Sequence, residues 1–95
     1  MNPEPSQFFK DLVSKPTSLG KDAVIFLEIP DGPQAFEEVL MLLRTINGFM
    51  DDYEILKSEF PMVIKVRLQP HEAREAVIRL TECGFASLKA FYPVR

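Results

Sequence analysis

The residues best suited to bind a ligand lie in one short loop, 31–34, which reads Asp-Gly-Pro-Gln. Asp31 precedes Gln34 by three positions, the spacing of a capping box at a helix start, and Gly32 with Pro33 shapes the opening turn. Backbone N–H groups at a helix start carry partial positive charge and can receive a carboxylate. The loop therefore predicts one of two roles: Asp31 and Gln34 cap the helix, or Asp31, Gly32, Pro33 and Gln34 bind a small carboxylated ligand.

Two further side chains, His71 and Cys83, lack the partners that a metal site or a nucleophile needs. His71 lies beside Glu72 and Glu75, but no second histidine accompanies it, so we interpret it as an exposed residue at a helix start. Cys83 directly precedes a glycine, and the sequence specifies no cationic neighbour that would activate its thiol. We expect Cys83 to be a small buried side chain.

An acidic cluster, Asp51, Asp52 and Glu54, occupies a predicted turn. Paired carboxylates can bind metal or share acid and base roles, but this cluster has no partner acid, base or ligand elsewhere in the sequence. No phosphate-binding glycine loop or catalytic triad is recognisable. We interpret the cluster as solvated turn residues, assign no catalytic residue, cofactor or metal ligand, and expect a protein that is not an enzyme.

The composition bounds the class of protein. The 95 residues suffice for one domain, and 46% hydrophobic with 26% charged residues is typical of a globular chain. The net charge of −3 argues against a nucleic-acid partner, because phosphate binding requires a cationic surplus. The single cysteine excludes a disulfide scaffold, and no apolar run approaches the roughly 18 residues that span a bilayer. We expect a cytoplasmic protein with no membrane partner.

The elements that position these residues follow from apolar periodicity between Ala23 and Tyr92. The pattern predicts strands at 23–29, 53–60, 62–68 and 85–92, a helix that ends at 47–48, and a second helix from Pro70 to Gly84. Two βαβ units with right-handed crossovers give an α+β, ferredoxin-like βαββαβ sandwich. We expect a four-stranded antiparallel sheet of order 4-1-3-2 with both helices on one face.

The two faces of this sheet have different predicted roles. The face toward the helices forms the core with Ile25, Leu27, Ile29, Phe36, Val39, Leu40, Leu43, Ile64, Val66, Leu68, Val77, Leu80 and Leu88. The open face carries Val24, Phe26, Glu28, Val63, Lys65, Arg67, Ser87, Lys89 and Phe91. Because this face has aromatic and basic residues, it could bind single-stranded RNA. We favour the alternative that the leader or a second subunit covers it.

The two edges of the sheet also differ. The second strand carries three charged residues that hinder its pairing with a further strand: Glu54, Lys57 and Glu59. The fourth strand carries one charged residue, Lys89. We therefore expect a homodimer that forms through the fourth strand or the remaining apolar surface.

Residues 1–21 form a leader outside the predicted 22–95 domain. Prolines, serines and a glycine interrupt this segment, but Ser6 can cap a short helix whose apolar side would consist of Phe8, Phe9, Leu12 and Val13. Two adjacent phenylalanines are costly to leave in water, so we expect the leader to dock on the open face.

Residues 23–92 resemble an ACT domain, a small regulatory βαββαβ module that often binds amino acids. The resemblance lies in an apolar strand that runs into Ile29-Pro30-Asp31-Gly32-Pro33, in Asn47-Gly48 after the first helix, and in the 75–80 segment that leads to Cys83-Gly84-Phe85. The family loop usually has proline before glycine, and here glycine comes first. The resemblance implies a ferredoxin-like fold and an amino-acid-like ligand at 31–34.

The sequence as a whole favours a small regulatory or protein-interaction module, homodimeric and without a cofactor. Two alternatives stay open at this point: a single-stranded RNA-binding sheet, and a small enzyme that completes its active site across a dimer interface. A salt-dependent shift with RNA would favour the former, and loss of activity on separation into monomers the latter.

Overall fold

The computed structural model describes residues 5–15, 20–30, 32–47 and 52–93. Within them the elements are α1 (Gln7–Val13), β1 (Ala23–Ile29), α2 (Pro33–Asn47), β2 (Tyr53–Lys57), β3 (Met62–Leu68), α3 (Pro70–Glu82) and β4 (Leu88–Phe91). The strands form a four-stranded antiparallel sheet in the order β2-β3-β1-β4. The predicted α+β class is confirmed, and so is the strand order 4-1-3-2, which is the same order counted from the other edge.

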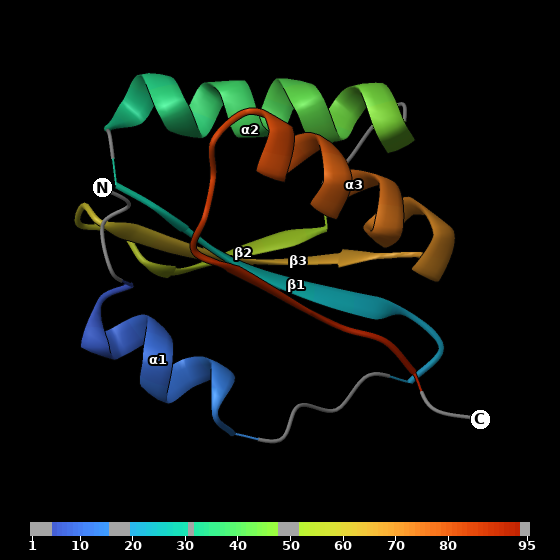
Figure 1. Ribbon diagram of the computed structural model, residues 1–95, viewed down its shortest axis with the longest axis horizontal. Coiled ribbons are helices and arrows are strands. Elements are labelled where there is room, and N and C mark those ends of the chain that lie inside the picture. The colour runs from blue at the N-terminus through green and yellow to red at the C-terminus, as the bar shows by residue number, and fades with distance from the viewer. Residues whose placement is uncertain (1–4, 16–19, 31, 48–51, 94–95) are drawn as a thin grey trace.

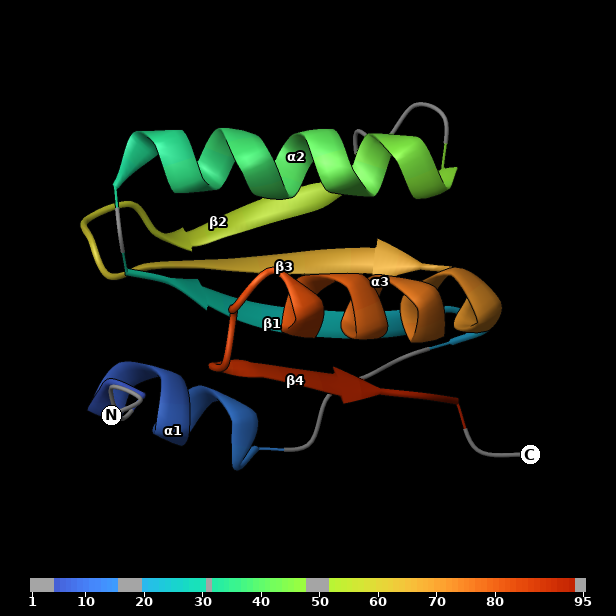
Figure 2. The same cartoon turned by 45° about the horizontal axis from the view of Figure 1, so that its top comes forward.

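The described elements form three layers. Helices α2 and α3 lie together on one face of the sheet, and α1 lies on the opposite face (Figure 1). The strands lie side by side, with β2 and β4 at opposite edges (Figure 2). The sheet therefore has a helix on each face, and the second face is the one that the leader was predicted to cover.

Strand β1 lies in the middle of the sheet because both of its faces are apolar. It pairs with β3 from Ala23, opposite Leu68, to Ile29, opposite Met62, and it pairs with β4 on its other side. All seven residues of β1 are buried. Edge strand β2 is only partly buried, as its charged residues predicted.

Proline and glycine mark the helix ends. Helix α2 begins at Pro33 and α3 at Pro70, positions where the missing N–H of proline costs no helical hydrogen bond. After α3, Gly84 takes φ +98°, a left-handed value that favours glycine, and the Phe85 N–H donates to the Leu80 carbonyl over 3.0 Å. The predicted stop of α2 at Gly48 lies outside the described residues.

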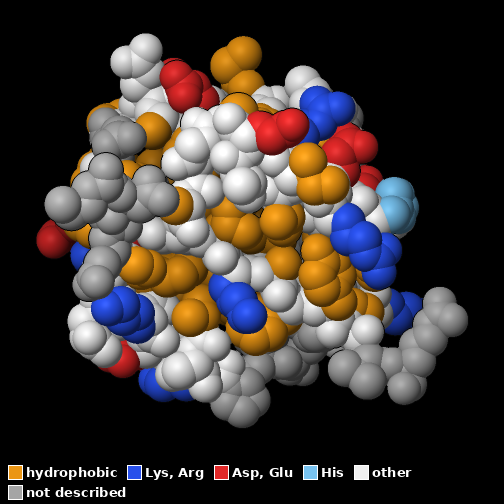
Figure 3. All heavy atoms as spheres, in the orientation of Figure 1, with side chains coloured by type: hydrophobic (Ala, Val, Ile, Leu, Met, Phe, Trp, Pro, Cys, Tyr) orange, Lys and Arg blue, Asp and Glu red, His pale blue; other side chains and the backbone are white. Residues whose placement is uncertain are grey.

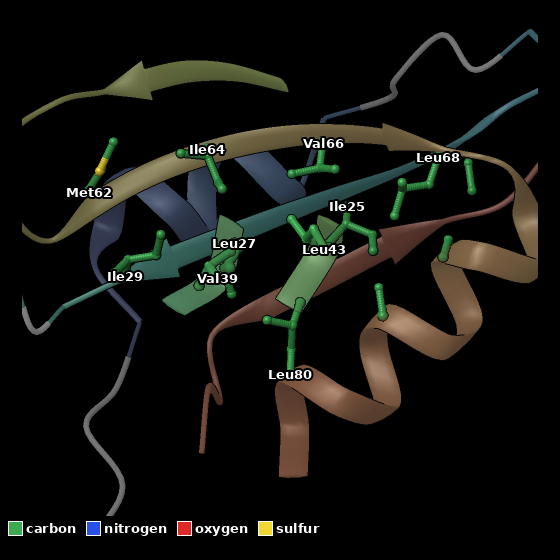
Figure 4. Packing of buried hydrophobic residues seen from close by; sticks show 13 residues of the cluster. Ile25, Leu27, Ile29, Val39, Leu43, Met62, Ile64, Val66, Leu68 and Leu80 are labelled. Carbon is green, nitrogen blue, oxygen red and sulfur yellow. The ribbon is translucent and has the colours of Figure 1, made fainter. Parts of the chain in front are cut away.

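The main core lies between the sheet and the pair α2 and α3 (Figure 4). Nine of the predicted core residues are fully buried there: Ile25, Leu27, Ile29, Val39, Leu43, Ile64, Val66, Leu68 and Leu80. Four others, Phe36, Leu40, Val77 and Leu88, are partly buried against them. The core also contains Ala23, Met62, Ala73 and Ala76, and the two alanines of α3 let that helix approach the sheet closely.

Three local predictions were wrong. Strand β4 begins at Leu88 rather than at Phe85, because the turn that ends α3 uses the N–H of Phe85. Strand β2 ends at Lys57 rather than at Phe60, after an irregularity in its pairing with β3 between Ile55 and Lys57. Cys83 is exposed rather than buried, because it caps the end of α3 beyond the last turn that packs on the sheet.

Candidate functional site

The predicted ligand loop lies at the start of α2. Asp31 lies outside the described residues, so its capping or binding role stays a prediction. The Gly32 carbonyl accepts hydrogen bonds from the N–H groups of Ala35, at 3.1 Å, and Phe36, at 3.3 Å, so the chain itself occupies these two donors. Pro33 and Gln34 are exposed. A ligand at this loop would have to use other backbone groups than those two.

The second face of the sheet is covered by α1. Phe9 is 4% exposed and packs with Val24, Phe26 and Val63 in a separate hydrophobic cluster. Partly buried residues around this cluster come from α1 and from both edge strands: Leu12, Val13, Leu56 and Phe91. Helix α1 therefore packs across the sheet from β2 to β4, as the leader was predicted to dock.

The two adjacent phenylalanines of α1 have different environments. Phe9 is buried, but Phe8 is 42% exposed, so the prediction that both face the sheet was wrong for Phe8. The Lys57 ammonium lies 5.8 Å from the centre of the Phe8 ring, a cation–π distance. On the covered face, the rings of Phe26 and Phe91 meet edge to face with centroids 5.8 Å apart.

A buried carboxylate joins α1 to the centre of the sheet. Glu28 in β1 is 5% exposed, and its Oε1 accepts a hydrogen bond from the Ser6 N–H at 3.1 Å. The Ser6 hydroxyl donates to the same carboxylate, and its oxygen accepts from the Phe9 N–H at 3.3 Å. Ser6 thus caps α1, as predicted, and also satisfies a charged group that would be costly to bury without donors.

The basic residues of this face have acidic neighbours. Glu54 lies opposite Lys65 in the ladder between β2 and β3, and the Arg67 N–H donates to the Asp52 carbonyl at 3.1 Å. A hollow of about 80 Å³ is lined by Asp52, Tyr53, Glu54, Lys65 and Arg67. Acidic and basic side chains of similar number face this hollow, which therefore does not form a cationic platform. Asp51, the first residue of the predicted acidic cluster, lies outside the described residues.

The residues weighed as a metal site or a nucleophile lie apart from one another. His71 at the start of α3 is exposed, and Cys83 is exposed at the end of the same helix. Among the described residues, no three His, Cys, Asp or Glu side chains gather closely enough to hold a metal ion.

Among the described residues, no strand pairs with the outer edge of β4. Glu28 N–H donates to the Ser87 carbonyl over 2.8 Å, directly before the ladder between β1 and β4 begins. Hydrogen-bonded and non-hydrogen-bonded pairs alternate along an antiparallel ladder, so Lys89 and Phe91 bond to β1 while Leu88 and Ala90 direct their backbone groups outward. These outward groups belong to a strand whose single charged residue is Lys89.

On the opposite edge of the sheet, Tyr53 and Ile55 of β2 direct their backbone N–H and C=O groups outward. Here the Arg67 N–H bonds to the Asp52 carbonyl, and the alternation continues from that pair. Glu54 and Lys57 flank these positions, and the irregularity between Ile55 and Lys57 interrupts the strand. Charges and irregularities both hinder addition of another strand. The two edges of the sheet are therefore unequal.

Comparisons of the chain with protein-family models, with curated proteins and with solved structures found no match. None of the helices in the described residues is long and apolar enough to cross a membrane.

Proposed function

We propose that this chain is a small regulatory or protein-interaction module of the ACT-like, ferredoxin-like type, and that two copies associate through β4. The order from β1 to β4, βαββαβ, and the strand order β2-β3-β1-β4 support this fold assignment. The observation that carries the functional proposal is the contrast between the edges: β4 presents the backbone groups of Leu88 and Ala90 beside one charged residue, whereas charges and an irregularity defend β2.

The pairing register follows from charge. If Lys89 lay opposite Lys89 of the partner subunit, two like charges would meet across the strands, which is destabilising. If Ala90 lies opposite Ala90 of the partner subunit, Lys89 lies opposite Phe91 of the partner subunit instead. Within one chain the Lys89 ammonium already lies 5.9 Å from the centre of the Phe91 ring, so this register keeps a cation beside an aromatic ring. The joined sheets would contain eight strands.

This proposal is preferred to an RNA-binding sheet because of the position of α1. Phe26, the aromatic side chain in the middle of the second face, is 2% exposed under α1 and has no face free for base stacking. The acidic neighbours of Lys65 and Arg67 weaken the attraction of that face for phosphate. Neither the burial of Phe26 under α1 nor these acidic neighbours would hinder pairing at the outer edge of β4.

An amino-acid-like ligand at residues 31–34 is part of the same proposal. It rests on the resemblance to ACT domains and on the position of Gly32, Pro33 and Gln34 at the start of α2. In that case the ligand carboxylate meets backbone N–H groups of the loop, and the ligand stabilises the native state in proportion to its occupancy.

Sedimentation velocity of the full chain over a range of concentrations tests the association. We expect a monomer–dimer equilibrium with a dissociation constant on the order of micromolar, typical of a small interface. Ala90→Pro removes an outward N–H while sparing the ladder to β1, so it should weaken association at least about tenfold. Ile55→Pro makes the matched change at the β2 edge and should leave association unchanged. A full chain that stays monomeric at high concentration would show that the proposal is wrong.

A further inference from the structure

A hollow at the opposite end of β1 from the 31–34 loop combines cations, an aromatic ring and rigid apolar walls. It has a volume of about 350 Å³ and is lined by Lys21, Pro70, Arg74, Tyr92 and Pro93. These residues come from three segments that are distant in sequence: the approach to β1, the first turns of α3, and the end of β4. Small-molecule sites typically have volumes of roughly 300 to 1,000 Å³, so the hollow is large enough for a compact ligand.

The described residues that line this hollow carry charges of one sign. Lys21 and Arg74 line it, and none of its five described lining residues carries a carboxylate. The chain as a whole has a net charge of −3, so the positive charge of these two residues is opposite in sign to the net charge of the protein. Figure 3 shows basic side chains beside hydrophobic surface near the single histidine, where α3 begins. Two cations around one hollow attract an anionic group.

The Arg74 side chain lies beside the Tyr92 ring. Its guanidinium carbon lies 5.3 Å from the centre of the Tyr92 ring. A guanidinium at cation–π distance from a ring still has N–H groups that can bind two oxygens of a carboxylate or phosphate. Arg74 is exposed, and its contact with Tyr92 reduces the number of conformations that it loses when it binds a ligand.

Pro70, at the start of α3, contributes apolar surface to the hollow. Pro70 has no N–H, the Gln69 N–H donates to Glu72 Oε1 at 3.1 Å, and the Ala73 N–H donates to the Gln69 carbonyl at 2.9 Å. The rings of Pro70, Pro93 and Tyr92 supply apolar surface. A ligand that fits this lining has an anionic head for Lys21 and Arg74 and a flat apolar part for the rings.

We propose that the hollow between Lys21, Arg74 and Tyr92 binds a small molecule in which a carboxylate or phosphate is attached to a flat apolar ring. This site lies at the opposite end of β1 from the 31–34 loop. Its existence does not depend on whether two copies associate.

A titration of the isotope-labelled full chain, followed by amide chemical shifts, tests the site with four probes: benzoate, phenyl phosphate, inorganic phosphate and phenol. We expect benzoate or phenyl phosphate to give saturable shifts at Lys21, Arg74 and Tyr92 at millimolar concentrations. Inorganic phosphate has the anionic group but no ring, and phenol has the ring but no anionic group. Each should therefore bind about tenfold more weakly. The stronger of the two ring-bearing anions identifies the preferred head group.

Variants without the positive charges test whether Arg74 and Lys21 bind the probe. Arg74→Gln and Lys21→Gln should each weaken binding of the better probe about tenfold, read from the shifts of Tyr92. Arg79→Gln removes an exposed arginine from the same helix outside the hollow and should leave binding unchanged. Unaltered shifts elsewhere in the spectrum show that each variant remains folded.

The proposal would be overturned by the absence of a saturable shift for any probe up to about 10 mM, by equal binding of phosphate and phenyl phosphate, or by equal effects of Arg74→Gln and Arg79→Gln. Shifts that cluster at Gly32, Gln34 and Ala35 instead would also overturn it, while they would support the loop as the ligand site.

Discussion

The side chains of Ser6 and Glu28 show how single residues join the leader to the sheet. The Glu28 carboxylate lies in a central strand where a charged group is costly, and the Ser6 N–H and hydroxyl provide its hydrogen-bond donors. One serine therefore begins α1, satisfies a buried charge and fixes the helix against β1. We expect Ser6 to contribute more to the free energy of unfolding than an ordinary helix cap does.

The first prediction at this scale compares two serines of the leader. Ser6→Ala removes the cap of α1 and one donor to Glu28, and should lower the free energy of unfolding by about 2 kcal/mol. Ser14→Ala removes a hydroxyl that donates to the Asp11 carbonyl on the exposed side of the chain, and should cost a few tenths of a kcal/mol. Urea denaturation of both variants measures the difference. Equal losses would mean that the link to Glu28 contributes nothing.

Of the two roles of Ser6, only the helix cap could be predicted from the sequence. The spacing around Ser6 predicted a helix cap, and the cap is present. The partner, Glu28, is 22 positions away, and no local pattern connects the two residues. The hollow around Lys21, Arg74 and Tyr92 escaped prediction for the same reason, since its residues come together only when α3 and β4 meet beside the start of β1. Contacts of this kind depend on the finished fold.

At the scale of elements, α1 converts a two-layer sandwich into three layers. It is a helix of seven residues, too short to be stable alone in water, so its packing against the sheet must hold it in place. The packing is concentrated in Phe9, which meets Val24, Phe26 and Val63. Without α1 these three side chains of the sheet would be exposed.

The second prediction uses the two neighbouring phenylalanines as a matched pair. Phe9→Ala should lower the free energy of unfolding by about 3 kcal/mol, because it empties the centre of the second cluster. Phe8→Ala removes an exposed ring and its approach to Lys57, and should cost less than about 1 kcal/mol. Thermal or urea denaturation gives both values. A larger loss from Phe8→Ala than from Phe9→Ala would reverse the assigned orientation of α1.

Element identity and order were predictable because each element has a strong local pattern. The uninterrupted apolar run of β1 indicated a central strand, and the alternation of β3 indicated which residues face the core. The short extents of β2 and β4 were not predictable, since the turn after α3 and the irregularity near Lys57 depend on backbone pairing rather than on residue type. The capping role of Asp31 stays a prediction, because it lies outside the described residues.

At the scale of the whole molecule, the described surfaces divide the sheet into covered and free parts. Helices α2 and α3 cover one face, and α1 covers the other. Charged residues lie along β2, and no strand of the described residues pairs with the outer edge of β4. A sheet that extends through β4 would hide the backbone groups of Leu88 and Ala90 from water.

Hydrogen–deuterium exchange of individual amides, measured on the full chain at dilute and concentrated conditions, tests this association most directly. We expect the amides of Leu88 and Ala90 to exchange rapidly when the protein is dilute and to become protected as its concentration rises. The Lys89 amide, bonded to β1, should be protected at both concentrations, and the Tyr53 and Ile55 amides at the β2 edge should stay unprotected. If exchange at Leu88 and Ala90 does not change with concentration, or if protection grows at Tyr53 and Ile55 instead, the assignment of β4 as the pairing edge is contradicted.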